Sequence, residues 1–280
     1  MAEYSPMMQK YLETKNKYKD CILFYRLGDF YEMFFEDAIT VSRELELTLT
    51  GKDCGQEERA PMAGIPHHAA DTYAAKLIAK GYKVAICEQL TDPKTTKGIV
   101  ERGVIRVLTP GTIVESNMLE ERKNNYIMSI YKSGIYFGLS VCDISTGEFY
   151  TTEIKEINNF EMLLDEIARF SPAEIITNKM LYNCDEEMAK IKERFDIYVT
   201  KFAEEHFTEE LKQEVREKYE ILDSSKKKIE NIDEKLLAIA SMNSLIEYLN
   251  ETQMTNLEHI NKIIIYNTSR YMALDVNARR

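Results

Sequence analysis

Phe30 and Glu32 stand two residues apart, directly after the pair Gly28-Asp29 and within the aromatic-rich stretch ILFYRLGDFYEMFF. A rigid aromatic ring beside a carboxylate can probe a nucleobase. The ring can insert between base steps and stack, which costs the DNA a few kcal/mol of unstacking and less where pairing is faulty. The carboxylate can accept a hydrogen bond from a base N–H, and it repels nearby phosphates. This pair is therefore a candidate site for reading DNA bases.

A strand and a helix are expected to position these two side chains. Residues 22–27 form a short apolar run rich in β-formers, which Gly28 ends. Asp29 is predicted to cap a helix, with Glu32 reaching back to the N–H of the cap. The apolar positions of this helix follow helical spacing at Phe30, Phe34, Ala38, Val41 and Leu45. The spacing alone favours a structural interpretation, in which Phe30 is a core residue and Glu32 a capping residue.

A resemblance to a known family favours the functional interpretation. GDFYE at 28–32 resembles the mismatch-recognition motif of MutS, a bacterial family of DNA mismatch-repair proteins. The likeness continues through APMAGIPHHA at 60–69, YKVAICEQL at 82–90, VIRVLTPGT at 104–112 and YMALDVNARR at 271–280. It is close over about the first hundred residues and looser beyond them.

The resemblance implies a role for individual residues of this motif. Phe30 would wedge at a mispaired base from the minor groove, Glu32 would hydrogen-bond that base, and Gly28 belongs to the same motif. The segment that contains Gly64 would lie near the DNA backbone. Gly64 can equally serve a turn, because glycine is the residue that tight turns favour.

The formal net charge of −11 argues against nucleic-acid binding by bulk electrostatics. The charge is unevenly spread. Residues 1–113 hold 15 Lys and Arg against 16 Asp and Glu, whereas residues 114–280 hold 21 against 31. DNA is therefore expected to contact the first part, through local basic residues such as Arg59, Arg102 and Arg106. The second part is expected to face protein or solvent.

Alternating helices and strands predict an α/β fold in two parts. Residues 1–115 are expected to form a mismatch-recognition domain with a mixed sheet, in which 60–66 is tight and irregular. The charged stretch NMLEERKNN indicates a linker at 116–125. The expected elements of this first domain are a helix to about 17, strands at 82–90 and 104–108, and a helix at 70–80.

The second part, at 126–250, begins with three strands at 126–131, 135–143 and 148–153. Ser133-Gly134 and Thr146-Gly147 separate them, which indicates an antiparallel meander. A helix at 157–170, a strand at 174–177, a helix at 184–194 and a strand at 195–199 follow. This order resembles the ribonuclease-H-like connector domain of the family. The chain is expected to be helical beyond Lys201, with a helix at 236–249 and then a final strand or extended segment at 263–274. Residues 251–280 would start a lever region that is cut short.

Two other kinds of chemistry are suggested by residues of this chain. A ribonuclease-H-like fold suggests a metal-dependent nuclease, with Asp143, Glu148 and Asp165 or Glu166 as candidate ligands. Asp143-Ile-Ser-Thr-Gly indicates an Asp-initiated turn equally well, and the connector domain implies no catalysis. The pair at 67–68 lacks the ligand spacing of a zinc site and is expected to cap a helix or contact the surface.

The chain is not expected to be an enzyme or to hold a cofactor or metal. Gly98 and Gly103 have the gap of a phosphate loop, but Val104-Ile105 stands where Lys and Ser or Thr are required. The resemblance places the family's ATPase, with its ATP and Mg²⁺, beyond residue 280. It implies three partners: double-stranded DNA with mismatches or small loops, a second copy of the full-length parent, and downstream repair proteins that dock on the connector domain.

The location is expected to be cytoplasmic. No apolar run approaches the ~18 residues of a membrane span, and the N-terminus lacks the apolar stretch of a signal peptide. The five cysteines are scattered without a CxxC pair, which fits reduced thiols. A different class of function also stays open: a protein-interaction module that docks a partner through its acidic connector-like domain and hardly contacts DNA in isolation.

Overall fold

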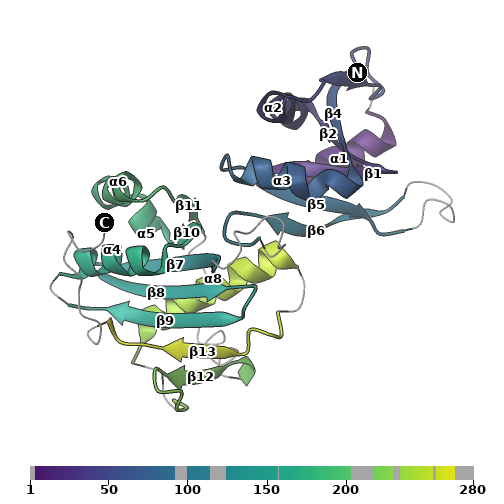
Figure 1. Cartoon of the computed structure of the whole chain (residues 1–280). Helices are drawn as coiled ribbons and strands as arrows, with labels where there is room; N and C mark the ends of the chain where they lie inside the picture. Colours follow the sequence, from purple (N-terminus) through teal and green to yellow (C-terminus); the bar gives the residue numbers. More distant parts are fainter. Residues whose placement is uncertain are drawn as a thin grey trace. The chain divides into compact units, whose positions relative to one another are not determined.

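The computed structural model describes residues 4–91, 100–113, 124–156, 158–202, 217–229, 232, 234–254 and 257–268 (Figure 1). Contacts between Cα atoms divide the chain into two compact units. The first comprises residues 1–120 and 251–254, and the second comprises 121–250 and 255–280. Most of the expected linker at 116–125, and the final residues 269–280, lie outside the described residues.

The first unit is built on a six-stranded mixed sheet (Figure 1). Its strands lie in the order β3-β4-β2-β1-β5-β6. Only β1 and β5 run parallel, and the other neighbours are antiparallel. The strands are β1 (Cys21–Leu27), β2 (Phe30–Phe34), β3 (Thr50–Lys52), β4 (Ala60–Pro66), β5 (Lys83–Gln89) and β6 (Arg102–Leu108).

Helices cover both faces of this sheet. Each strand contributes side chains to both faces, because successive side chains of a strand point in opposite directions. Tyr31 and Met33 of β2 join a buried cluster with α2 (Phe35–Leu45) and α3 (Ala70–Ile78). Phe34 points the other way and packs with Met8 and Tyr11 of α1 (Pro6–Lys17). The short 3₁₀ helix η1 (His67–Ala69) leads from β4 into α3.

The helix predicted to start at Asp29 is wrong in its first turn. Residues 30–34 form the strand β2, and α2 begins only at Phe35. Gly28 reverses the chain, so that β2 folds back on β1 and pairs with β4 on its other side. Two neighbouring strands outweigh the local capping signal, and Glu32 therefore has no helix end to cap.

The segment at 60–66 is also not irregular. It forms β4, which lies between β3 and β2 in the sheet. Proline cannot donate to a strand ladder and is favoured near strand ends, and Pro61 and Pro66 stand at the second and last positions of β4. Gly64 lies within the strand, so its predicted role in a turn is wrong.

The second unit is built on a seven-stranded mixed sheet in the order β11-β10-β7-β8-β9-β13-β12. The expected meander is present as β7 (Tyr126–Ser133), β8 (Tyr136–Asp143) and β9 (Glu148–Ile154). On the other side of β7, β10 (Glu174–Thr177) and β11 (Tyr198–Lys201) run parallel to it. This arrangement confirms the ribonuclease-H-like fold class.

Helices pack on both faces of the second sheet. One face carries α4 (Asn159–Phe170), α5 (Lys179–Tyr182) and α6 (Asp185–Arg194), whose buried side chains meet those of β7 and β8. On the other face α8 (Leu236–Gln253) lies against β8, where the hydroxyl oxygens of Ser140 and Ser241 are 2.8 Å apart. Gly138 allows this close approach, because a Cβ there would stand 1.9 Å from the carbonyl oxygen of Leu237.

Of two strands beyond Lys201, the first corrects the prediction of a helical continuation, and the second agrees with the final strand or extended segment expected from residue 263. β12 (Glu220–Asp223) and β13 (Lys262–Ile265) run parallel to each other, and β13 pairs with β9. Ile221 and Ile263 are buried in this extension of the sheet. Each strand is only four residues long. For β12 this is too short for the hydrophobic pattern to indicate a strand, and the pairing with a neighbouring strand defines it. The sheet of the second unit therefore includes residues beyond 250, where the lever was expected to begin.

Among the residues that the structure describes, no helix is both long and apolar enough to cross a membrane. The cytoplasmic location stays a prediction.

Candidate nucleic-acid interface

The hairpin between β1 and β2 ends in a two-residue turn of Gly28 and Asp29, with Leu27 opposite Phe30. Gly28 has a φ of +61°, and a Cβ there would meet nothing within 4 Å. Glycine is therefore required by the backbone conformation, as in type II′ hairpin turns, and not by lack of space. His67 fastens the turn, because its backbone N–H donates to the carbonyl oxygen of Asp29 over 2.9 Å.

Phe30 is the first residue of β2, and the residue is 46% exposed. It lies between Leu27 of β1 and Pro66 of β4. The next residues of the strand, Tyr31, Met33 and Phe34, are buried. A phenylalanine ring left in solvent beside a buried strand is available to a ligand, so the core interpretation of Phe30 is wrong.

Glu32 lies on the same face of β2 as Phe30 and forms an ion pair with Lys52 at the end of β3. The Glu32 side chain is 16% exposed and that of Lys52 is 33% exposed. On β4 the residue opposite Glu32 is Gly64, which has no side chain to cover the carboxylate. The candidate pair thus presents one exposed ring and one ion-paired carboxylate.

A polar network ties the hairpin to β5 and β6: Tyr31 and Arg26 contact β5 on the face away from Glu32, whereas the Arg102 guanidinium of β6 lies over the ring of Tyr25, on the Glu32 face. Glu88 of β5 accepts hydrogen bonds from the hydroxyl of Tyr31 and, at 3.3 Å, from Nη1 of Arg26. Arg102 of β6 donates to the carbonyl oxygen of Arg26 over 2.7 Å. Burial, together with the neighbouring Glu88 carboxylate, raises the pKa of Tyr31, so its hydroxyl stays a donor. These contacts fix the strand that carries Phe30.

A second network, around the buried carboxylate of Asp37, anchors the far end of β2. Asp37 of α2 accepts from the backbone N–H of Leu23 at 3.0 Å and from Lys15 Nζ at 2.9 Å. The hydroxyl of Tyr11 lies 3.4 Å from the same carboxylate and also accepts from the N–H of Phe34. The carboxylate of Asp37 therefore has hydrogen-bond partners that connect α1, β1, β2 and α2.

The other predicted contact residues are not all brought together. Gly64 lies directly opposite Glu32 on β4. Arg59 is exposed and precedes β4, next to the edge strand β3. Arg106 is half-buried on β6, the opposite edge of the sheet, opposite Ile86. Arg59 and Arg106 thus flank the sheet at its two edges.

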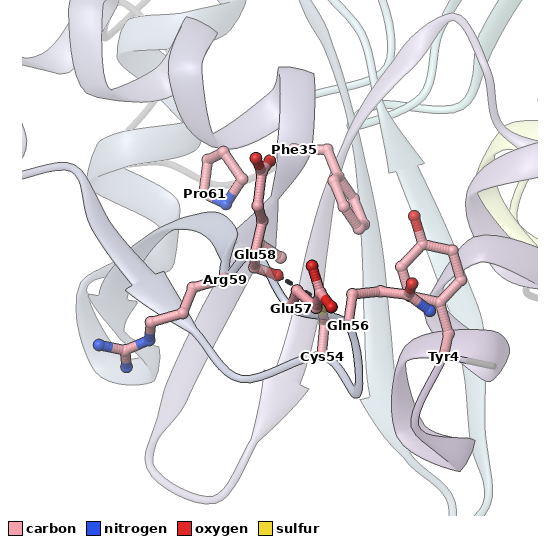
Figure 2. Close-up of a pocket in the computed structure, with 9 residues that line it drawn as sticks. Tyr4, Phe35, Cys54, Gln56, Glu57, Glu58, Arg59 and Pro61 are labelled. Atoms are coloured by element: carbon pink, nitrogen blue, oxygen red, sulfur yellow. Dashed lines mark hydrogen bonds between the residues drawn. The ribbon is translucent and has the colours of Figure 1, made fainter. Parts of the chain in front are cut away.

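A pocket of about 700 Å³ lies beyond the far end of β2 from Phe30 (Figure 2). Tyr4, Phe35, Cys54, Gln56, Glu57, Glu58, Arg59, Ala60 and Pro61 line it. The rings of Tyr4 and Phe35 meet edge to face, with centroids 6.0 Å apart. The Arg59 side chain extends away from these rings (Figure 2). Neither Phe30 nor Glu32 lines this pocket, and Arg59 is the predicted contact residue that does.

Comparison with protein families shows to which family this chain belongs. A model of MutS domain I matches residues 5–117, and a model of MutS domain II matches residues 125–261. The chain belongs to the MutS family. It is 52% identical to the DNA mismatch repair protein MutS of Acetivibrio thermocellus, and 53% identical to that of Ruminiclostridium cellulolyticum. Each comparison covers 100% of this chain and 32% of the relative, so the chain spans about a third of the length of these relatives.

The carboxylates proposed for a nuclease in the MutS domain II region each have other partners. Asp143 is buried, and its Oδ1 accepts from the N–H and the hydroxyl of Ser145 at 2.8 and 2.6 Å. Glu148 accepts from the hydroxyl of Tyr126. Asp143 is therefore engaged in the Asp-initiated turn that its sequence indicates. The described residues contain no group of three or more His, Cys, Asp or Glu that could hold a metal.

Lys52 is the member of the candidate site that the sequence does not reveal. It lies 20 residues from Glu32, and β4 stands between their two strands. No local spacing indicates such a pair. Only the order of the strands, which places β3 and β2 on either side of β4, brings Lys52 within reach of Glu32.

Proposed function

We propose that this chain is the N-terminal part of a MutS protein that senses mispaired or unpaired bases in double-stranded DNA. Phe30 inserts at the faulty base from the minor groove, and Glu32 hydrogen-bonds that base. One observation carries the proposal: Phe30 is 46% exposed at the tip of a hairpin, directly before the buried Tyr31. Membership of the MutS family and the match to its domain I support it.

The property that this site reads is the ease with which DNA deforms. An inserted apolar ring partly unstacks a base step and kinks the duplex, and this costs less where pairing is already faulty. The contacts that anchor the hairpin support this role. A ring held on a rigid strand deforms the DNA when it inserts and is not itself pushed aside. Glu32 adds discrimination, since its charge is unfavourable near phosphates unless a base N–H is there to pair with it.

The remaining contact residues take supporting roles in the proposal. Gly28 shapes the turn before Phe30, and Gly64 leaves room beside Glu32. Arg59 and Arg106, at the two edges of the sheet, are the proposed contacts to the phosphate backbone. Contacts of this kind position a protein on the duplex and carry no sequence information.

The proposal also assigns a role to each part of the chain. Residues 1–115 form the mismatch-recognition domain, 116–125 a linker, and 126–250 the connector domain, whose sheet is completed by β13 at Lys262–Ile265. Residues 251–280 lead toward a lever. ATP and Mg²⁺ bind in the parent beyond residue 280. A second copy of the parent and downstream repair proteins are its proposed partners.

A second candidate is a protein-interaction module with negligible DNA binding in isolation. The observation that favours it is the charge of residues 114–280, which hold 21 Lys and Arg against 31 Asp and Glu. Such a surface repels DNA and suits a basic protein partner. In this case DNA contact would arise only within the parent.

The two candidates are separated by titrating the chain and the parent with a duplex that carries one G·T mismatch and with its matched counterpart, at several salt concentrations. The sensor predicts tighter binding to the mismatched duplex in the parent. It also predicts a shallow salt dependence, because few phosphates are neutralised by the near-neutral first unit. Equal affinity of the parent for both duplexes at every salt concentration would contradict the sensor and leave the interaction module.

A further inference from the structure

Lys52 contacts two residues of β2 at once. Its Nζ forms an ion pair with Oε2 of Glu32, and the same nitrogen lies 5.7 Å from the centroid of the Phe34 ring. Phe34 is buried, so the Lys52 ammonium lies over a ring of the core while it is paired with Glu32. β3 ends at Lys52, where it pairs with Ala60 of β4.

The pairing occupies only one side of the carboxylate. Lys52 takes Oε2 of Glu32, and no other residue in the described ranges bonds to Oε1. An ionised carboxylate accepts hydrogen bonds through both oxygens. Oε1 is thus left as an acceptor on the face of the sheet that carries the exposed ring of Phe30. Gly64, opposite Glu32, adds no side chain that would cover it.

We propose that Lys52 is a positioning residue for mismatch recognition: it holds Oε2 of Glu32, so that Oε1 is directed to the base beside Phe30. This inference rests on the proposed function. The ion pair also offsets part of the negative charge of Glu32, which lies where phosphates approach. A side chain with a single fixed orientation loses less conformational entropy when it binds the base.

A simple phosphate contact is the competing role for Lys52. The two roles differ in what they affect. A phosphate contact strengthens binding to every duplex equally, because phosphates are present in all of them. A residue that orients Glu32 changes the preference for mismatched over matched DNA, and it does so only while Glu32 is present. A double-mutant cycle therefore distinguishes them.

The test measures, in the full-length parent, the affinity for a G·T duplex relative to its matched counterpart. Lys52→Met keeps a long, unbranched side chain beside Phe34 but removes the charge. It is expected to lower the preference about three- to tenfold, the net effect of one hydrogen bond. Lys52→Arg keeps the charge and is expected to restore the preference. In a Glu32→Gln background, Lys52→Met is expected to change the preference less than about twofold.

Lys76→Met is the matched control, because Lys76 is an exposed lysine of α3 whose Nζ lies over the ring of Tyr73. It removes the same charge and is expected to leave the preference unchanged. Thermal unfolding of each variant shows that it is folded.

The possible failures are distinguishable. If Glu32→Gln lowers the preference but Lys52→Met lowers both affinities equally, Lys52 is a phosphate contact and the inference is overturned. The same holds if Lys52→Met lowers the preference equally in the Glu32→Gln background. If Glu32→Gln itself leaves the preference intact, the proposed role of Glu32 fails, and the inference that rests on it fails too.

Discussion

At the scale of single residues, Phe30 owes its exposure to the turn that precedes it. Gly28 adopts a positive φ, which reverses the chain so that the ring stands at the end of the sheet. The sequence predicts the pair Phe30 and Glu32 as a candidate site, because their types and the GDFYE motif can be recognised locally. It does not predict Lys52, whose contact with Glu32 depends on strand order.

The requirement for glycine at this turn can be measured. Gly28→Ala forces a left-handed conformation on a residue with a Cβ, which costs about 1–2 kcal/mol. We expect the free energy of unfolding to fall by about this amount in urea titrations of the chain. Gly64→Ala is the control, because Gly64 lies in a strand and a Cβ there would make ordinary contacts at 3.8 Å. Equal stability of Gly28→Ala and the unaltered chain would contradict the assigned turn.

At the scale of elements, the longer segments were predictable, whereas several segments whose state depends on strand pairing were not. The helix at 236–249 and the three strands of the meander are present as α8, β7, β8 and β9. The residues of β2 keep helical spacing with α2 in the sequence, yet they form a strand between β1 and β4. Pairing with residues distant in the sequence overrides local propensity there, and the same holds for β4 and β12.

The packing of α8 on β8 gives a test at this scale. A Cβ on Gly138 would stand 1.9 Å from the backbone oxygen of Leu237, which cannot move away as a flexible side chain could. We expect Gly138→Ala to lower the free energy of unfolding by about 1–3 kcal/mol, the usual cost of overpacking. Ser133→Ala, an exposed change at the end of β7, serves as the control. Chemical denaturation of both variants measures the difference, and a Gly138→Ala chain of undiminished stability would refute the close approach.

At the scale of the whole molecule, one buried carboxylate links pH to stability. Burial raises the pKa of Glu166 above its usual value of 4.5, although Tyr266 and Arg169 donate to it. The folded chain therefore holds this proton to a higher pH than the unfolded chain does. The stabilisation from Glu166 is complete below about pH 4.5 and is lost as pH rises through the folded pKa.

Glu166→Gln removes this titration and keeps an acceptor for Tyr266. We expect the free energy of unfolding of the variant to lose less than that of the unaltered chain between pH 4.5 and pH 7, measured by urea titration at each pH. Glu186→Gln is the control, because Glu186 is exposed and its pKa is lowered by Lys190, which reverses the sign. A pH dependence that Glu166→Gln leaves unaltered would show that Glu166 is not its source.

Also at the scale of the whole molecule, the uneven charge agrees with different roles for the two parts of the chain. The near-neutral first 113 residues carry the exposed ring, and the acidic remainder forms the second sheet. On the proposed function, DNA contact would be confined to a small site in the first unit, and we expect the mismatch preference to depend on very few side chains.

The most direct test of this account is the affinity of the full-length parent for a G·T duplex relative to matched DNA, with Phe30→Ala beside Ile39→Ala. Ile39 is an exposed apolar residue of α2, away from the hairpin. We expect Phe30→Ala to remove about 1–3 kcal/mol of binding free energy from the mismatched complex, the contribution of an aromatic ring stacked on a base, and so to abolish the preference. Ile39→Ala should retain it. A folded Phe30→Ala protein that still prefers the mismatched duplex would contradict the central claim.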